Sequence, residues 1–168
     1  MYQIGDYIVH EGIGVCEVTD ICEMALSGKG TERTYYVLVP YGDKGGRTFT
    51  PVDSDKIRMR PVMSRQEINE LVGTIPSVDC IQENNDKLRA VKYKEALGAF
   101  EAGKLLEIIK TVYLGKQRRI RSGKKVLSGD EKYFQIAEKK LYDEIAFVFS
   151  EDTDQVKRWI TDEIKKCS

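Results

Sequence analysis

The stretch YQIGDYIVHEGIGVCEV, residues 2–18, decides the fold of the N-terminal part, together with YYVLVP at 35–40 and FTPV at 49–52. These are short runs rich in Val, Ile and Tyr, and Gly, Asp, Lys and Pro separate them. β-Branched and aromatic residues between turn residues are typical of strands. We therefore expect a small SH3-like or Tudor-like antiparallel β-barrel, with strands at residues 7–10, 14–22, 34–40, 47–50 and 56–60.

The spacing of the apolar residues changes near Pro61, from the period of a strand to that of a helix. Ser64 and Glu67 form a capping box that begins a first helix, and Pro76 ends it. A second helix covers residues 86–102 and ends at Gly103, and Ser77 is a candidate cap for its early turns.

Three apolar stripes predict the remaining helices. They consist of Leu105, Ile108, Ile109 and Val112, then Phe134, Ala137, Leu141, Ile145 and Val148, and finally Val156, Ile160 and Ile164. A second capping box, Ser128 to Glu131, precedes the second stripe, and the last helix covers residues 153–166. Such helices are marginal alone, so we expect a bundle of four or five. The predicted fold is α+β, with domains at 1–62 and 63–168.

Several classes of protein are excluded. An apolar fraction of 41% with 32% charged residues is typical of a globular chain, and no apolar run is long enough to span a bilayer. The four cysteines form no Cys-x-x-Cys pair and the chain has one histidine, so we expect buried thiols and no metal. We find no Walker spacing and no paired nucleophile and base, so we expect no catalytic residues and no cofactor. No secretory signal is visible, which favours a cytoplasmic protein.

The N-terminal motifs I-G-D-x-I-V-H, G-I-G-V, Y-Y-V-L and T-P-V-D, in this order, resemble the RNA-polymerase-interacting domain of the CarD/CdnL family. The same module occurs in the bacterial transcription-repair coupling factor. Residues 126–132, 137–141 and 144–146 are similar to the family's L-S-x-x-E-K, A-x-x-x-L and E-L-A signature. The resemblance thus covers nearly the whole chain. It implies a non-enzymatic bacterial transcription regulator that binds the RNA polymerase β subunit and promoter DNA near the upstream edge of the bubble. We expect the protein to be a monomer.

The longest basic stretch without an acid lies between Glu107 and Asp130. Such a run can neutralise phosphates without reading the base sequence, although a solvated loop between two helices has the same composition. A second basic group precedes it on the predicted second helix. The residues that we predict to contact DNA are Lys87, Arg89, Lys92, Lys116, Arg118, Arg119, Arg121, Lys124 and Lys125.

The family resemblance implies a Trp wedge in the second helix, and its position falls on Arg89, counted back from Tyr93, Lys94 and Gly103. The only Trp of this chain is Trp159, in the last helix. Arg89 either enters a narrow minor groove through its charge or lies on a solvent-facing turn.

The resemblance also places the polymerase-binding residues at Met24, Arg47 and Phe49. Met24 and Phe49 are candidate apolar anchors and Arg47 supplies a charge, while strand alternation leaves it open whether Phe49 points into the barrel core. A protein-only adaptor for polymerase or for the repair machinery, without a DNA wedge, is the alternative function.

Overall fold

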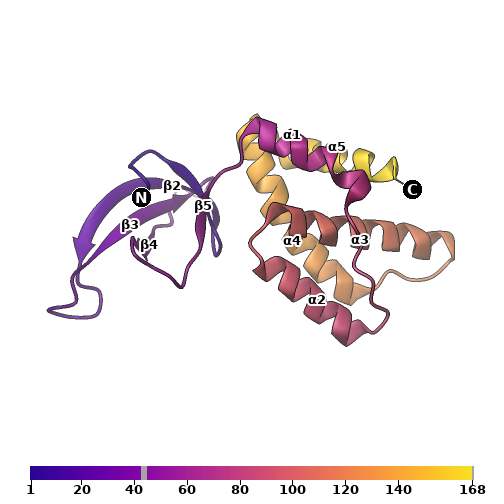
Figure 1. Cartoon of the computed structure of the whole chain (residues 1–168), viewed down its shortest axis with the longest axis horizontal. Helices are drawn as coiled ribbons and strands as arrows, with labels where there is room; N and C mark the ends of the chain where they lie inside the picture. Colours follow the sequence, from indigo (N-terminus) through magenta and orange to yellow (C-terminus); the bar gives the residue numbers. More distant parts are fainter. Residues whose placement is uncertain (43–44, 168) are drawn as a thin grey trace. The chain divides into compact units, whose positions relative to one another are not determined.

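The structure is a computed structural model that describes residues 1–42 and 45–167. The chain divides into two compact units, Met1–Val62 and Met63–Ser168. The first unit is a β-sheet and the second is helical (Figure 1). Two residues of the loop predicted between the third and fourth strands, 43 and 44, lie outside the described residues.

Five antiparallel strands of the described chain form one sheet in the order β4-β3-β2-β1-β5. Their bounds are Tyr7–His10 (β1), Gly14–Met24 (β2), Arg33–Pro40 (β3), Thr48–Pro51 (β4) and Met59–Pro61 (β5). The register shifts between Val18 and Asp20, where a bulge bends the long strand β2. The prediction of a barrel is wrong in one respect, because the sheet is not closed. β4 and β5 are the two edge strands. With four and three residues, they offer few backbone N–H and C=O groups for the hydrogen bonds that would close the sheet.

One face of the sheet holds a small apolar core. Its buried members are Ile8, Cys16, Val18, Tyr36 and Leu38. Burial raises the pKa of the Cys16 thiol to about 11, so this cysteine behaves as a small apolar side chain. None of the four cysteines forms a disulfide. A core of this size is what a sheet of about sixty residues can bury.

His10 joins the turn after β1 to the edge strand β4. The Gly12 backbone N–H donates to its Nδ1 at 3.0 Å, and its Nε2 lies 3.3 Å from the Thr50 hydroxyl oxygen. Since Nδ1 accepts a hydrogen bond, the proton of the neutral ring is on Nε2 and is donated to Thr50. Burial lowers the pKa of His10, and the nearby Glu11 opposes this effect. The arrangement gives His10 a structural task.

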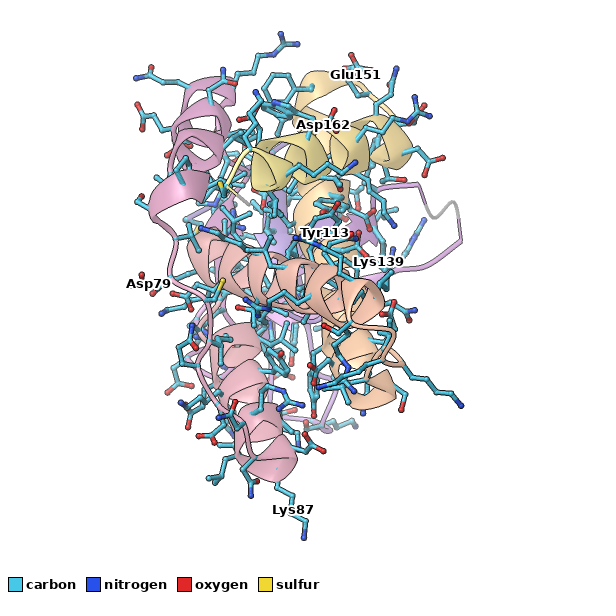
Figure 2. All side chains as sticks on the ribbon, turned by 90° about the vertical axis from the view of Figure 1, so that its right-hand side faces the viewer. Asp79, Lys87, Tyr113, Lys139, Glu151 and Asp162 are labelled. Atoms are coloured by element: carbon cyan, nitrogen blue, oxygen red, sulfur yellow. The ribbon has the colours of Figure 1, made fainter. Side chains whose placement is uncertain are left out.

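The helical unit contains five α-helices among its described residues. They are Arg65–Gly73 (α1), Asp86–Gly98 (α2), Ala102–Arg121 (α3), Ser128–Phe149 (α4) and Thr153–Lys165 (α5), with a short 3-10 helix at Ile75–Ser77. α4 contacts each of the other α-helices. α1 and α5 lie at one end of the unit and α2 at the other, with α3 between them (Figures 1 and 2). α4 is therefore the central element of the bundle.

The core of this unit is built from the predicted stripes. Of the twelve stripe residues, all are buried except Val148, which is partly buried against the same core. Lys110 and Glu144 are among the polar residues that are buried with them. The Lys110 ammonium donates to the carbonyl oxygens of Ile75 and Val78, each at 2.7 Å, and the Glu144 carboxylate accepts from the Met63 N–H at 2.8 Å. Both groups fix irregular backbone to a helix of the core.

The helix boundaries confirm one capping prediction and correct three. Both hydrogen bonds of the capping box at Ser64 are present. The second helix is capped by Asn85, not by Ser77. It ends at Gly98, because the chain takes a left-handed turn at Phe100 (φ 57°), and Gly103 lies inside α3. The capping box at Ser128 is wrong, since Leu127 occupies the N-cap position and no side chain caps α4.

Candidate functional site

The residues predicted to bind polymerase lie around strand β3. Met24 is paired with Arg33, and Phe49 is paired with Val37. Arg33 and Val37 are four residues apart on one strand, so Met24 and Phe49 share one face of the sheet. They lie on opposite sides of β3, about 13 Å apart along its direction.

Phe49 is exposed, with 41% of its surface accessible, and it therefore does not belong to the sheet core. The neighbouring Thr50 is fully buried, which is the alternation that a half-buried strand requires. Arg47 is exposed just before β4, and Met24 is half-buried. Of the two orientations left open for Phe49, the structure has the outward one.

Sequence analysis missed two aromatic side chains of this unit. Tyr7 and Tyr41 are both exposed, and the Tyr7 hydroxyl lies 3.4 Å from the Glu17 carboxylate. Glu17 raises the pKa of Tyr7, with a smaller contribution from Tyr41. Tyr7 pairs with Glu17, and Glu17 pairs with Val39, which places Tyr7 on the face that carries Phe49. Side chains alternate between the two faces along a strand, so the alternation along the first strand and its neighbours could have predicted that Tyr7 points outward.

Arg89 is buried, with 9% of its surface exposed. Its guanidinium donates to the Asp130 carboxylate at 3.0 Å, to the Asp86 carboxylate at 2.8 Å and to the Glu83 carbonyl oxygen at 3.1 Å. Both predicted roles, groove contact and solvent-facing turn, assume an exposed side chain, and this assumption is wrong. A contact with DNA would have to break bonds that join α2 to the start of α4.

The outward face of α2 carries other side chains. Leu88 is 55% exposed and Val91 is 48% exposed, one helical turn apart. Figure 2 shows the Lys87 side chain extending away from the start of α2. Lys92 is exposed, but its ammonium donates to the Gln82 carbonyl oxygen at 2.9 Å and lies 3.7 Å from the Glu83 carboxylate. Lys87 is the predicted DNA contact on this helix that has no such partner among the described residues.

Some of the basic residues at the end of α3 and in the loop after it already have partners within the protein, and others do not. Lys116 forms an ion pair with Glu131 and lies over the Phe134 ring, 4.2 Å from its centroid. Arg119 donates from Nε to the Lys125 carbonyl oxygen at 2.6 Å, which holds the loop between α3 and α4. The cations that are exposed and form no ion pair with any described residue are Arg118, Arg121, Lys124 and Lys125. We call these four residues the basic tip.

None of the described helices combines the length and the apolar character that crossing a membrane requires. Within residues 1–42 and 45–167, no group of three or more His, Cys, Asp or Glu side chains comes together in a way that could hold a metal ion.

Comparison with known proteins gives one family. Residues 2–63 match the model of the CarD-like/TRCF RID domain. No curated protein matches the chain. The match spans the whole sheet, from the residues before β1 to those after β5, and leaves the helical unit unmatched apart from its first residue. The resemblance of the C-terminal half to the family signature therefore stays a prediction. The N-terminal part of this chain belongs to the CarD-like/TRCF RID family, whose domain is an RNA-polymerase-interacting domain.

Proposed function

We propose that the protein is a non-enzymatic transcription regulator of the CarD type. Its sheet binds the RNA polymerase β subunit, and its helical unit contacts promoter DNA near the upstream edge of the melted region. The match of residues 2–63 to an RNA-polymerase-interacting domain carries this proposal. Binding the open complex more tightly than the closed complex shifts the equilibrium toward the open one, by no more than the difference between the two affinities.

The polymerase contact is assigned to the face of the sheet that carries Phe49. Phe49 and Met24 supply apolar surface on this face, and Arg47 supplies a positive charge beside it. A few buried aromatic or arginine side chains dominate the affinity of most protein interfaces. Phe49 is therefore expected to be an anchor of the interface.

The test uses the full chain and purified β subunit. Phe49→Ala should weaken binding at least about fivefold, because an anchor truncated to Ala commonly costs more than about 1 kcal/mol. Leu26→Ala is the matched control, because Leu26 is also an exposed apolar residue of this unit and lies outside the strands. Equal binding by wild type and Phe49→Ala would remove this face from the interface.

The DNA contact is assigned to the basic tip and to Lys87. These cations are exposed and are not neutralised by neighbouring acids in the described chain. Phosphate contacts of this kind release counterions and give affinity that depends on salt more than on base sequence. Arg89 is left out of the proposed surface, because its guanidinium is already bonded to Asp130 and Asp86.

The double variant Arg118→Ala, Arg121→Ala tests this assignment. It should weaken duplex binding similarly for unrelated sequences and lower the slope of log affinity against log salt by up to about two. Arg158→Ala is the control, because Arg158 is an exposed arginine of α5 without an ion pair in the described residues. An unchanged slope in the double variant would mean that Arg118 and Arg121 are solvated side chains that do not contact DNA.

A protein-only adaptor is the second candidate. The burial of Arg89 and the exposed apolar pair Leu88 and Val91 on α2 favour it, because apolar surface suits a protein partner as well as a base step. Wild-type protein that binds the β subunit but shows no salt-dependent affinity for promoter DNA, free or in the polymerase complex, would select the adaptor.

A further inference from the structure

One face of the sheet carries two neighbouring rows of side chains, and the first row contains Phe49. Val37 of β3 pairs with Phe49 of β4 on one side and with Asp20 of β2 on the other. Directly paired residues of an antiparallel ladder lie on one face, so Asp20, Val37 and Phe49 form a row. Ile21, which follows Asp20, packs against the sheet core, and this places Asp20 on the face opposite the core.

The second row lies beside the first and contains Tyr7. Tyr7 of β1 pairs with Glu17 of β2, and Glu17 pairs with Val39 of β3. Val39 is two residues after Val37 on the same strand, so the two rows are about 7 Å apart on one face. We use the name Phe49 face for the surface formed by Tyr7, Glu17, Val39, Asp20, Val37 and Phe49.

The Phe49 face exposes two aromatic rings, one in each row. Phe49 is 41% exposed and Tyr7 is 38% exposed. Single exposed apolar residues are common on protein surfaces, but these two rings share one face with Val37 and Val39. Aromatic side chains are enriched in protein interfaces, because they supply a large contact area at a small cost in conformational entropy. The Phe49 face therefore suits a protein partner.

The two acids of the Phe49 face both lie on β2, between the rings. Glu17 is half-buried and Asp20 is exposed, and neither forms an ion pair with any described residue. The Tyr7 hydroxyl lies 3.4 Å from the Glu17 carboxylate, and the Asp20 carboxylate accepts from the Ile21 N–H at 2.8 Å. A partner that covers the rings also removes water from these carboxylates, which is unfavourable unless a cation pairs with them.

The arginines of the sheet do not neutralise these acids. The described strands contain two arginines, Arg33 and Arg60, and no lysine. Arg33 forms its ion pair with Asp53, at 2.7 Å. Arg60 lies on the edge strand β5 and donates to the Pro61 carbonyl oxygen at 3.1 Å. The middle of the Phe49 face thus keeps two negative charges that complement a basic partner.

We propose that the Phe49 face receives an arginine side chain of the polymerase β subunit, whose guanidinium pairs with Glu17 and Asp20 between the rings of Tyr7 and Phe49. This inference rests on the proposed binding of the β subunit and adds the chemistry of the contact. A guanidinium group forms bidentate hydrogen bonds with carboxylates and stacks on aromatic rings, so one side chain satisfies both features of the face. DNA does not fit there, because the carboxylates repel phosphates.

Binding of the full chain to purified β subunit tests the proposal. Glu17→Gln keeps the size of the side chain and removes its charge, and it should weaken binding at least about fivefold without changing the thermal midpoint of the chain. Asp20→Asn should weaken binding less, because an exposed charge is screened by solvent and salt. Glu23→Gln is the matched control, because Glu23 is an exposed glutamate of β2 that lies two residues after Ile21, on the core face.

An arginine-to-alanine scan of the β subunit identifies the partner residue. One arginine should give a loss of affinity that is not additive with Glu17→Gln, because either change alone already breaks the pair. Complete additivity for every arginine in the scan would overturn the proposal.

The other outcomes separate this inference from the proposed function. Wild type that does not bind the β subunit would contradict the proposed function and would remove this occupant with it. Wild type that binds, together with equal affinities of Glu17→Gln and Glu23→Gln, would overturn only the inference about arginine. Sedimentation of the chain alone checks for a second copy as the occupant. Self-association that is lost in Glu17→Gln, while β-subunit binding is unchanged, would assign the Phe49 face to a second copy and overturn the proposal.

Discussion

Replacing Arg89 by Ala should destabilise the helical unit. The substitution removes the donors to Asp130, Asp86 and the Glu83 carbonyl oxygen. The Asp130 side chain is only 19% exposed and loses its charged partner, which costs about 2 kcal/mol. The unpaired carbonyl oxygen adds about 1 kcal/mol, and the Asp86 bond adds little because Asp86 is largely exposed. The total is about 3 kcal/mol.

Thermal unfolding followed by far-ultraviolet circular dichroism measures this loss, because the helices dominate that signal. For a unit of this size, about 3 kcal/mol lowers the midpoint by roughly 10–20 °C. Arg89→Lys keeps the charge but cannot form the planar fork, so it should fall between wild type and Arg89→Ala. Lys87→Ala is the control on the same helix, because Lys87 is exposed.

A midpoint of Arg89→Ala within about 2 °C of wild type, which corresponds to less than about 0.5 kcal/mol, would show that the Arg89 hydrogen bonds do not stabilise the helical unit. A double-mutant cycle with Asp130→Asn isolates the pair that joins α2 to α4. Its coupling energy should be about 1–2 kcal/mol, and a value near zero would mean that the two side chains act independently.

Two further predictions concern buried polar groups. Burial lowers the folded pKa of His10, so its contribution to stability is complete above its unfolded value of about 6.5 and is lost as the pH falls through the lower folded pKa. Hydrogen exchange of the Gly12 amide should therefore speed up toward about pH 5 beyond the intrinsic pH effect, and constant protection would contradict this role. Lys110→Met leaves carbonyl oxygens after α1 without a donor and should cost about 2–4 kcal/mol in urea unfolding. Lys104→Met on the same helix removes only a half-exposed ion pair with Glu107 and should cost little, and equal losses in both variants would contradict the assignment.

Much of the local structure follows from the order of the residues. The first strand has the predicted bounds, and the bounds of β2, β3 and β4 differ from the prediction by at most two residues at either end. The Ser64 capping box forms as expected. These features depend on contacts a few residues apart, so a strand period or an S-x-x-E motif is sufficient to predict them.

The candidate site was harder to predict, and Arg89 shows why. Its charge and its place on a polar helix resemble those of Lys87, yet one side chain is buried and the other is exposed. Three positions separate Asp86 from Arg89, but the partner that joins it to α4, Asp130, lies 41 positions away. No local pattern identifies such a partner.

Sequence alone determined the strand and helix character of the two parts of the chain, the division of apolar from polar faces, and the family resemblance of the first sixty residues. Tertiary structure decided that the sheet stays open, that Leu127 and not Ser128 occupies the N-cap position of α4, and that Arg89 is buried while Arg118 is exposed. The physical reason is the range of the interactions. Propensity and period act over one or two turns of chain, whereas sheet closure and charge pairing depend on segments that meet only in the folded protein.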